Sequence, residues 1–294
     1  MASLHTGVLD VSHEVTGPRD GSTVMLVHGW PDAARGWRQV AARLNEWGWR
    51  TVLPELRGSG ATRFLSSSTP RDGQAVALAQ AVLDLADGLG MGRFAVVGHD
   101  WGARVAYTLG ALVPERITAI AALALAYQPG ALFPVPDFEQ ARAFWYQWLL
   151  CLDAGADAVR RDPIGFARIQ WDTWSPPGWF NEQEFAATAS SFTNPDWVEI
   201  TLNAYRARFL PDEPRDARYE QHRRLARVDR LRVPTLMIHG GSDSCDAPSS
   251  SEGLEESFVG PYRRVLLDGV GHFPHREDAQ TVAELVHQHL REHH

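Results

Sequence analysis

The sequence predicts an α/β protein in which a mostly parallel sheet carries helices on both faces and an inserted helical cap. Short apolar runs alternate along the chain with segments of helical spacing, a pattern typical of parallel sheets. The alternation stops between about residues 128 and 229, where the chain is rich in Trp and Pro and keeps helical periodicity. We therefore expect a core domain of residues 1–127 and 230–294 and a helical cap domain of residues 128–229.

The expected strands share a short apolar run, and in chain order they are Val24–Gly29, Arg50–Leu53, Phe94–Gly98, Ile117–Leu125, Pro234–His239 and Tyr262–Leu267. Helical spacing separates several of them, as in Gln74–Leu89 and Ala103–Leu112. The carboxyl ends of parallel strands meet at one edge of a sheet, and ligands bind there. Residues that directly follow these strands are therefore the candidates for a functional site.

Composition limits the possible partners. A formal charge of −8 over 294 residues disfavours binding to nucleic acid or to an anionic membrane surface. The longest apolar run, Ile117 to Tyr127, is too short to span a bilayer, and residues 1–10 show no basic region followed by an apolar stretch, so we expect no secretory leader. Two cysteines, Cys151 and Cys245, cannot build a disulfide framework. We expect a cytoplasmic protein with a small-molecule substrate, no nucleic-acid partner and no membrane partner, and leave its oligomeric state open.

The sequence Gly-His-Asp-Trp-Gly at residues 98–102 places Asp100 at a tight turn between a strand and a helix. A carboxylate that attacks an acyl carbon forms an unstable anhydride, whereas attack on a saturated carbon forms an ordinary ester. The substrate is thus expected to carry its leaving group on an sp³ carbon, as an epoxide or an alkyl halide does. The structural alternative is an aspartate that only caps the following helix.

Hydrolysis of such an ester needs a general base, and His272 lies in the loop after the last expected strand. His275 is its nearest competitor, but its place at a helix start indicates a capping or surface group. Asp243, which follows the strand Pro234–His239, is expected to orient the imidazole, with Asp246 as the second choice. Protonation of His272 predicts loss of activity below about pH 6.

The sequence His-Gly-Trp-Pro at residues 28–31 follows the first expected parallel strand. We assign the backbone N–H groups of Trp30 and Trp101 to an oxyanion hole. His28 is interpreted as a structural residue that ties this loop.

These motifs, together with Gly-Gly-Ser-Asp at 240–243 and Gly-His-Phe-Pro-His-Arg-Glu at 271–277, resemble the α/β-hydrolase-fold epoxide hydrolases and their relatives, the haloalkane and haloacetate dehalogenases. The resemblance covers the core domain nearly from end to end. It implies the α/β-hydrolase fold and chemistry without a cofactor or a metal. One departure is Glu55, where relatives usually carry aspartate, and we expect a structural effect only.

The resemblance also implies roles for residues of the cap. Related epoxide hydrolases point two cap tyrosines at the oxirane oxygen, and Tyr146, followed by Gln147, and Tyr205, followed by Arg206, match both contexts. The alternative for either tyrosine is core packing. A dehalogenase would instead cradle halide between Trp101 and Trp148, although haloacetate dehalogenases tend to have histidine where Gln147 stands.

The resulting prediction is an epoxide hydrolase that converts a neutral apolar or aromatic epoxide into a vicinal diol through an aspartyl ester. The predicted catalytic residues are Asp100, Asp243, His272, Tyr146 and Tyr205, and Trp30, Trp101, Gln147 and Trp148 form the oxyanion hole or contact the substrate. A dehalogenase with the same nucleophile and a non-catalytic ligand-binding protein are the alternatives.

Overall fold

The computed structural model describes residues 1–131, 136–210 and 212–293. Its strands within these residues are β1 (Ala2–Thr6), β2 (Leu9–Thr16), β3 (Thr23–Val27), β4 (Arg50–Pro54), β5 (Arg63–Phe64), β6 (Phe94–His99), β7 (Ile117–Leu123), β8 (Thr235–Gly240) and β9 (Tyr262–Leu267). They form one sheet in the order β1-β2-β4-β3-β6-β7-β8-β9, with β5 paired to β2. All neighbours from β4 to β9 pair in parallel.

The α-helices of the described residues are α1 (Arg38–Glu46), α2 (Ala75–Gly88), α3 (Trp101–Leu112), α4 (Phe138–Ala143), α5 (Trp145–Cys151), α6 (Asp153–Arg161), α7 (Pro163–Thr173), α8 (Glu182–Ala189), α9 (Trp197–Phe209), α10 (Glu220–Leu225), α11 (Pro274–Glu277) and α12 (Ala279–His293). Short 3₁₀ helices lie at Ala34–Trp37, Pro129–Ala131, Ser190–Thr193, Ala217–Tyr219, Pro248–Ser251 and Glu255–Ser257. None of these described helices combines the length and the apolar character that a membrane crossing needs.

The predicted parallel sheet is confirmed, and all six expected strands are present. The expected strand Ile117–Leu125 ends at Leu123, because Ala124 adopts a φ of 68° that breaks the extended conformation. The antiparallel strands β1, β2 and β5 were not expected. They lie at one edge of the sheet and carry several exposed or half-exposed polar residues, so they lack the continuous apolar run of a buried strand.

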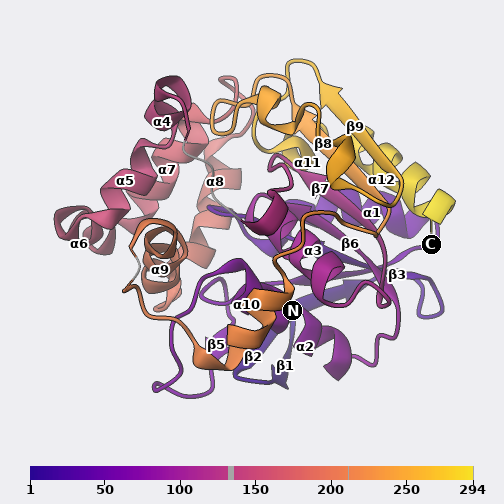
Figure 1. Ribbon diagram of the computed structural model, residues 1–294, viewed down its shortest axis with the longest axis horizontal. Coiled ribbons are helices and arrows are strands. Elements are labelled where there is room, and N and C mark those ends of the chain that lie inside the picture. Colours follow the sequence, from indigo (N-terminus) through magenta and orange to yellow (C-terminus); the bar gives the residue numbers. More distant parts are fainter. Residues whose placement is uncertain (132–135, 211, 294) are drawn as a thin grey trace.

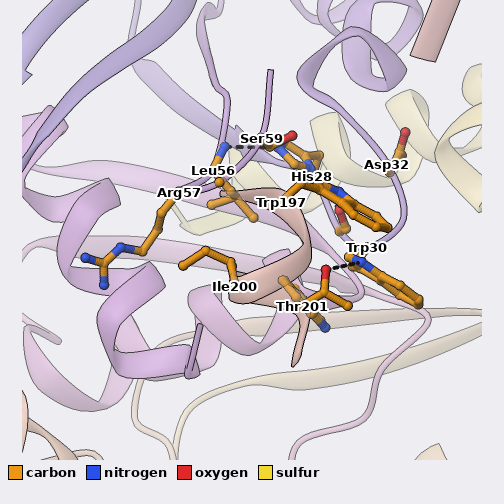
Figure 2. A pocket seen from close by; sticks show the side chains of 12 residues that line it. His28, Trp30, Asp32, Leu56, Arg57, Ser59, Trp197, Ile200 and Thr201 are labelled. Carbon is orange, nitrogen blue, oxygen red and sulfur yellow. Dashed lines mark hydrogen bonds between the residues drawn. The ribbon is translucent and has the colours of Figure 1, made fainter. Parts of the chain in front are cut away.

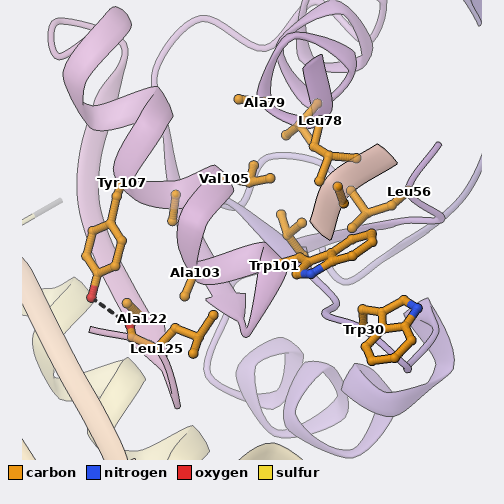
Figure 3. Packing of buried hydrophobic residues seen from close by; sticks show 14 of the residues in the cluster. Trp30, Leu56, Leu78, Ala79, Trp101, Ala103, Val105, Tyr107, Ala122 and Leu125 are labelled. Carbon is orange, nitrogen blue, oxygen red and sulfur yellow. Dashed lines mark hydrogen bonds between the residues drawn. The ribbon is translucent and has the colours of Figure 1, made fainter. Parts of the chain in front are cut away.

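Two apolar clusters hold the sheet between its helices. Successive residues of β3 alternate between them: Met25 and Val27 join α2 and α3 on one face, and Val24 and Leu26 join α1 and α12 on the other. Burying one such side chain stabilises the fold by about 1.5–3 kcal/mol. Figure 3 shows part of the first cluster, in which the rings of Trp30 and Trp101 lie near each other at its margin. That margin leads from the core to the candidate site.

Helices α4–α10 all lie between β7 and β8 in the chain. Figure 1 shows α4–α9 grouped beside the sheet, on the left of the view, whereas α10 packs against α3 of the core. The described part of this insertion contains no strand. The division into a core and a cap of residues 128–229 stays a prediction, and positions 132–135 and 211 of that range lie outside the described residues.

Candidate active site

Asp100 occupies a sharp turn between β6 and α3. Its backbone has φ 51° and ψ −113°, a conformation that L-residues rarely adopt and that often marks a functional site. A Cβ added at Gly98 would lie 2.0 Å from the Gly102 carbonyl oxygen, and one at Gly102 would lie 2.1 Å from the Val27 carbonyl oxygen. Both glycines are therefore required for the close approach of β3, β6 and α3. The turn presents the carboxylate of Asp100 at the carboxyl edge of the sheet.

His272 lies beside Asp100 and is held by Asp243. Its Nδ1 lies 2.8 Å from Asp243 Oδ2, and its Nε2 lies 3.7 Å from Asp100 Oδ2. Among the described residues this Nε2 has no hydrogen-bond partner, and the carboxylate of Asp100 lies within ion-pair distance of it. The structure therefore brings together the three side chains predicted from motifs at the ends of β6, β8 and β9.

The second-choice acid, Asp246, does not take the place of Asp243. Its backbone N–H donates to Asp243 Oδ1 at 3.1 Å, as does that of Cys245 at 2.8 Å. These two bonds fix the carboxylate of Asp243 through Oδ1, while its Oδ2 contacts the His272 imidazole. Burial and the negative charge of Asp243 raise the pKa of Asp246 to about 6, which makes it a weaker partner for a positive imidazole.

Charge coupling dominates the electrostatics of the site. Burial opposes ionisation of Asp243, but the charges and hydrogen bonds of His272 and His239 together outweigh it and lower the pKa of Asp243 to about 2. Burial likewise opposes a charge on His272, yet Asp243 and Asp100 raise the pKa of this imidazole to about 10. The resting site at neutral pH thus holds an imidazolium between two carboxylates.

The loop that carries Trp30 provides one hydrogen-bond donor to the carboxylate of Asp100. The Trp30 backbone N–H donates to Asp100 Oδ1 at 2.8 Å. The loop is tied on both sides, since Leu56 N–H donates to His28 Nε2 at 3.0 Å and the Trp30 indole N–H donates to Thr201 Oγ1 at 2.9 Å. Figure 2 shows these residues around a small cavity of about 10 Å³. His28 has the structural position expected of it, and the anchor Thr201 was not predicted.

Tyr146 on α5 and Tyr205 on α9 lie next to each other, beside the loop that carries Trp30. Their ring centroids lie 5.3 Å apart, and the Trp30 ring contacts both. Burial raises the pKa of each phenol, and the negative charge of Asp100 adds to the effect on both. Both hydroxyls therefore keep their protons at neutral pH. The Trp101 indole N–H donates to Tyr205 Oη at 3.3 Å.

The other predicted cap residues separate into two groups. Gln147 is buried, and its amide donates to Tyr146 Oη at 3.1 Å. Trp148 is 37% exposed, and its indole N–H donates to the Ala141 carbonyl oxygen at 2.9 Å. Trp148 therefore lies away from the residues around Asp100. The backbone N–H of Trp101 begins α3, and its assignment as the second oxyanion donor stays a prediction.

The loop that carries His272 is held by a carboxylate that was not predicted. Glu277 accepts hydrogen bonds from Gly271 N–H at 2.6 Å, Phe273 N–H at 2.9 Å and Ser175 Oγ at 2.7 Å. Ser175 Oγ lies 2.8 Å from the backbone nitrogen of His272. Glu277 thus fixes the backbone on both sides of His272. The motif at 271–277 contains Glu277, but spacing alone does not reveal this role.

A second buried cluster lies behind the site. Potential ligand atoms of Asp32, His99 and His275 lie within 4.8 Å of one another. Arg276 already supplies positive charge there through Nη2, 2.5 Å from Asp32 Oδ1, and its Nη1 lies 2.5 Å from Glu184 Oε1 on α8. A metal ion would have to compete with this guanidinium for Asp32. The arrangement therefore favours an ion-pair network, which links the loop that carries Asp32 to helix α8 through Arg276, over a metal site. His275 is buried, which corrects the surface position expected for it.

Comparison with known proteins shows similarity along most of the chain. A family model described as the alpha/beta hydrolase fold matches residues 22–279. Epoxide hydrolase A of Mycobacterium tuberculosis is 28% identical over 89% of this chain and 88% of its own length. Epoxide hydrolase 3 of Xenopus tropicalis is 33% identical over 94% of this chain and 73% of its own length. The crystal structure of a candidate epoxide hydrolase from Klebsiella pneumoniae superimposes with a TM-score of 0.92 at 35% identity. The match covers 99% of this chain and 97% of that protein.

Proposed function

This chain belongs to the α/β-hydrolase fold family, among its epoxide hydrolases, and from that premise we propose that it converts an epoxide into a vicinal diol through an aspartyl ester. The observation that carries the proposal is the carboxylate of Asp100 at the strained turn, 3.7 Å from an imidazole that Asp243 orients. The aromatic side chains around it, Trp30, Tyr146 and Tyr205, favour an apolar or aromatic skeleton next to the oxirane.

In the first step, Asp100 attacks a ring carbon and the carbon–oxygen bond of the oxirane breaks. The bond electrons go to the oxygen, which becomes a hydroxyl by taking a proton from Tyr146 or Tyr205. The raised pKa values of these phenols support this role, because a donor must hold its proton until the alkoxide develops. The product is a hydroxyalkyl ester of Asp100.

Before the second step, the imidazolium of the resting site gives its proton to the phenolate left by the first step. The neutral His272 then removes a proton from water, and the resulting hydroxide attacks the ester carbonyl carbon of Asp100. The Trp30 N–H, which donates to Asp100 Oδ1 at 2.8 Å, is placed to stabilise the oxyanion. Collapse of the tetrahedral intermediate releases the diol and restores the carboxylate. The proton of the added hydroxyl passes to the departing alkoxide, and His272 keeps the proton taken from water, which restores the imidazolium of the resting site.

The positions of two indoles favour an epoxide over an alkyl halide. A halide cradle would need the N–H groups of Trp101 and Trp148 to converge on a departing anion. The Trp101 N–H donates instead to Tyr205 Oη and the Trp148 N–H to Ala141. Ring opening needs proton donors near the oxygen, and the two buried tyrosines meet that need.

The test is diol formation from styrene oxide, with halide release from a bromoalkane and from haloacetate followed in parallel. Diol without halide supports the proposal. Halide without diol would reassign the chain to a dehalogenase and leave Tyr146 and Tyr205 as packing residues. Neither product, with no covalent mass shift of the protein, would favour a non-catalytic binding protein.

Removing the tyrosine hydroxyls is expected to slow ring opening. General acid catalysis contributes about 10²–10⁴-fold, so the Tyr146→Phe, Tyr205→Phe double variant is expected to alkylate at least about 10²-fold more slowly. Single-turnover mixing with styrene oxide measures this rate. Tyr219→Phe, a buried tyrosine outside the site, is the matched control and is expected to keep the wild-type rate. A double variant that retains a tenth of that rate would contradict the assignment.

The two chemical steps are expected to differ in their dependence on pH. The pKa of His272, about 10 in the resting site, depends partly on the charge of Asp100, which disappears when the ester forms. The pKa of His272 therefore falls in the intermediate, and only the deprotonated imidazole can accept a proton from water. Single-turnover measurements are expected to show alkylation that is constant from about pH 5 to 9 and ester hydrolysis that slows in acid. Hydrolysis that stayed constant down to about pH 4 would contradict this role of His272.

A further inference from the structure

A second, larger cavity lies next to the site, between α3 of the core and α9. Its volume is about 430 Å³, and its lining includes five arginines, Arg104, Arg208, Arg215, Arg223 and Arg227. Its described lining residues include neither aspartate nor glutamate. This concentration of positive charge stands in a chain whose net charge is −8. A small region of one sign in a protein of the other sign attracts a ligand of matching charge.

Three of the five arginines form no ion pair among the described residues. Arg223 is paired with Asp72. By contrast, Arg104, Arg215 and Arg227 form no ion pair with an acidic side chain in the described parts of the chain. Arg104 Nη1 reaches only the neutral Gln128 Oε1, at 3.4 Å, and its Nε is buried without a hydrogen-bond partner. A buried guanidinium N–H without an acceptor is costly, and a bound anion would satisfy it.

Arg208 places a second guanidinium at the same cavity. Its Nη1 donates to Gln147 Oε1 at 3.0 Å, and its guanidinium carbon lies 4.9 Å from the centre of the Tyr205 ring. Burial, followed by the positive charge of Arg104, lowers the pKa of Arg208 to about 10. The two cations therefore repel each other across the cavity, and an anion between them would reverse that unfavourable interaction.

The cavity adjoins the residues that surround Asp100. Trp101 lines both this cavity and the small cavity beside the Trp30 loop. Arg104 lies in the first turn of α3, and its backbone N–H donates to the Asp100 carbonyl oxygen at 3.2 Å. Arg208 follows Tyr205 by three residues on α9, so both lie on one face of that helix. A molecule held at Asp100 can thus place its far end against these arginines.

We propose that this cavity is an anion subsite that binds a carboxylate carried by the substrate at the end remote from the oxirane. The proposal rests on the proposed function and replaces the neutral substrate expected from the sequence with an epoxide that has an apolar body and a terminal carboxylate. A neutral epoxide would leave Arg104, Arg215 and Arg227 without an ion-pair partner among the described residues. Binding energy from the remote carboxylate would position the ring carbon for attack by Asp100.

The test compares each acid with its own primary amide, which has nearly the same shape and no charge. The pairs are 4-(oxiran-2-yl)benzoic acid and its amide, and 10,11-epoxyundecanoic acid and its amide, with styrene oxide as the reference. The expected result is a kcat/KM at least about tenfold higher for the acid in one pair or both. Equal values within both pairs would overturn the subsite. Absence of diol from every compound, styrene oxide included, would instead sink the proposed function.

A charge-matched pair of variants locates the effect. Arg104→Gln is expected to lower the acid-to-amide ratio of kcat/KM at least about fivefold. Arg93→Gln removes the same charge from an exposed position at the opposite end of β6 and is expected to leave that ratio unchanged. An equal fall in both variants would contradict the local subsite, since it would show an effect of net charge alone. The wild-type comparison stands even where a variant fails to fold.

Discussion

Replacing Asp100 by alanine is expected to abolish diol formation and to prevent any covalent adduct. The side chain is the proposed nucleophile, and loss of a nucleophile typically lowers kcat by about 10⁴-fold or more. Diol formation from styrene oxide measures turnover, and intact-protein mass spectrometry after incubation with substrate measures the adduct. The expected result is an unmodified mass at every time point.

The control for this variant must separate chemistry from folding. Alanine tolerates the positive φ of this turn less well than aspartate, so thermal unfolding of Asp100→Ala is to be measured beside activity. Asp268→Ala removes an exposed carboxylate from the loop that follows β9 and is expected to keep wild-type turnover. A folded Asp100→Ala protein that still produced diol over many turnovers would exclude the aspartyl-ester mechanism.

The proximity of the proposed catalytic residues could be predicted because local steric requirements place them. Gly98 and Gly102 are needed where β3, β6 and α3 approach one another, and Asp100, midway between them, therefore lies in the turn. His272 and Asp243 follow parallel strands, so their side chains meet at the same edge of the sheet. Apolar runs predict such strands well, which is why six strands of the sheet were expected and its exposed antiparallel edge was not.

The arrangement of the helices inserted between β7 and β8 and the arginine-lined cavity depend on tertiary packing that no local pattern encodes. Tyr146, Gln147 and Trp148 are consecutive, yet the first two are buried and Trp148 turns outward to Ala141. Periodicity identifies the helix but not which face meets the core. Arg104 and Arg208 are separated by most of the insertion and come together only when α9 packs near α3. Their shared cavity could therefore not be predicted from the sequence.

Replacing His272 by glutamine is expected to separate the two chemical steps. Glutamine can still hydrogen-bond to Asp243 but cannot take a proton from water, so ester hydrolysis is expected to slow by about 10²–10⁴-fold. Asp100 remains in place to attack the epoxide. Each protein molecule is therefore expected to gain one substrate molecule and then to stop, which intact-protein mass spectrometry and a stoichiometric burst of substrate loss both detect.

A control variant and two alternative outcomes complete the test of His272→Gln. His5→Gln, at an exposed histidine remote in sequence from the motifs, serves as the matched control and is expected to turn over normally without a stable adduct. If His272→Gln lost turnover and formed no adduct, the imidazolium would be needed in the first step as well, to keep Asp100 reactive. Wild-type turnover would exclude His272 as the base. A one-to-one adduct that peptide mapping places on Asp100 would confirm both the nucleophile and the order of the steps, because the ester can persist only where the base that removes it is missing.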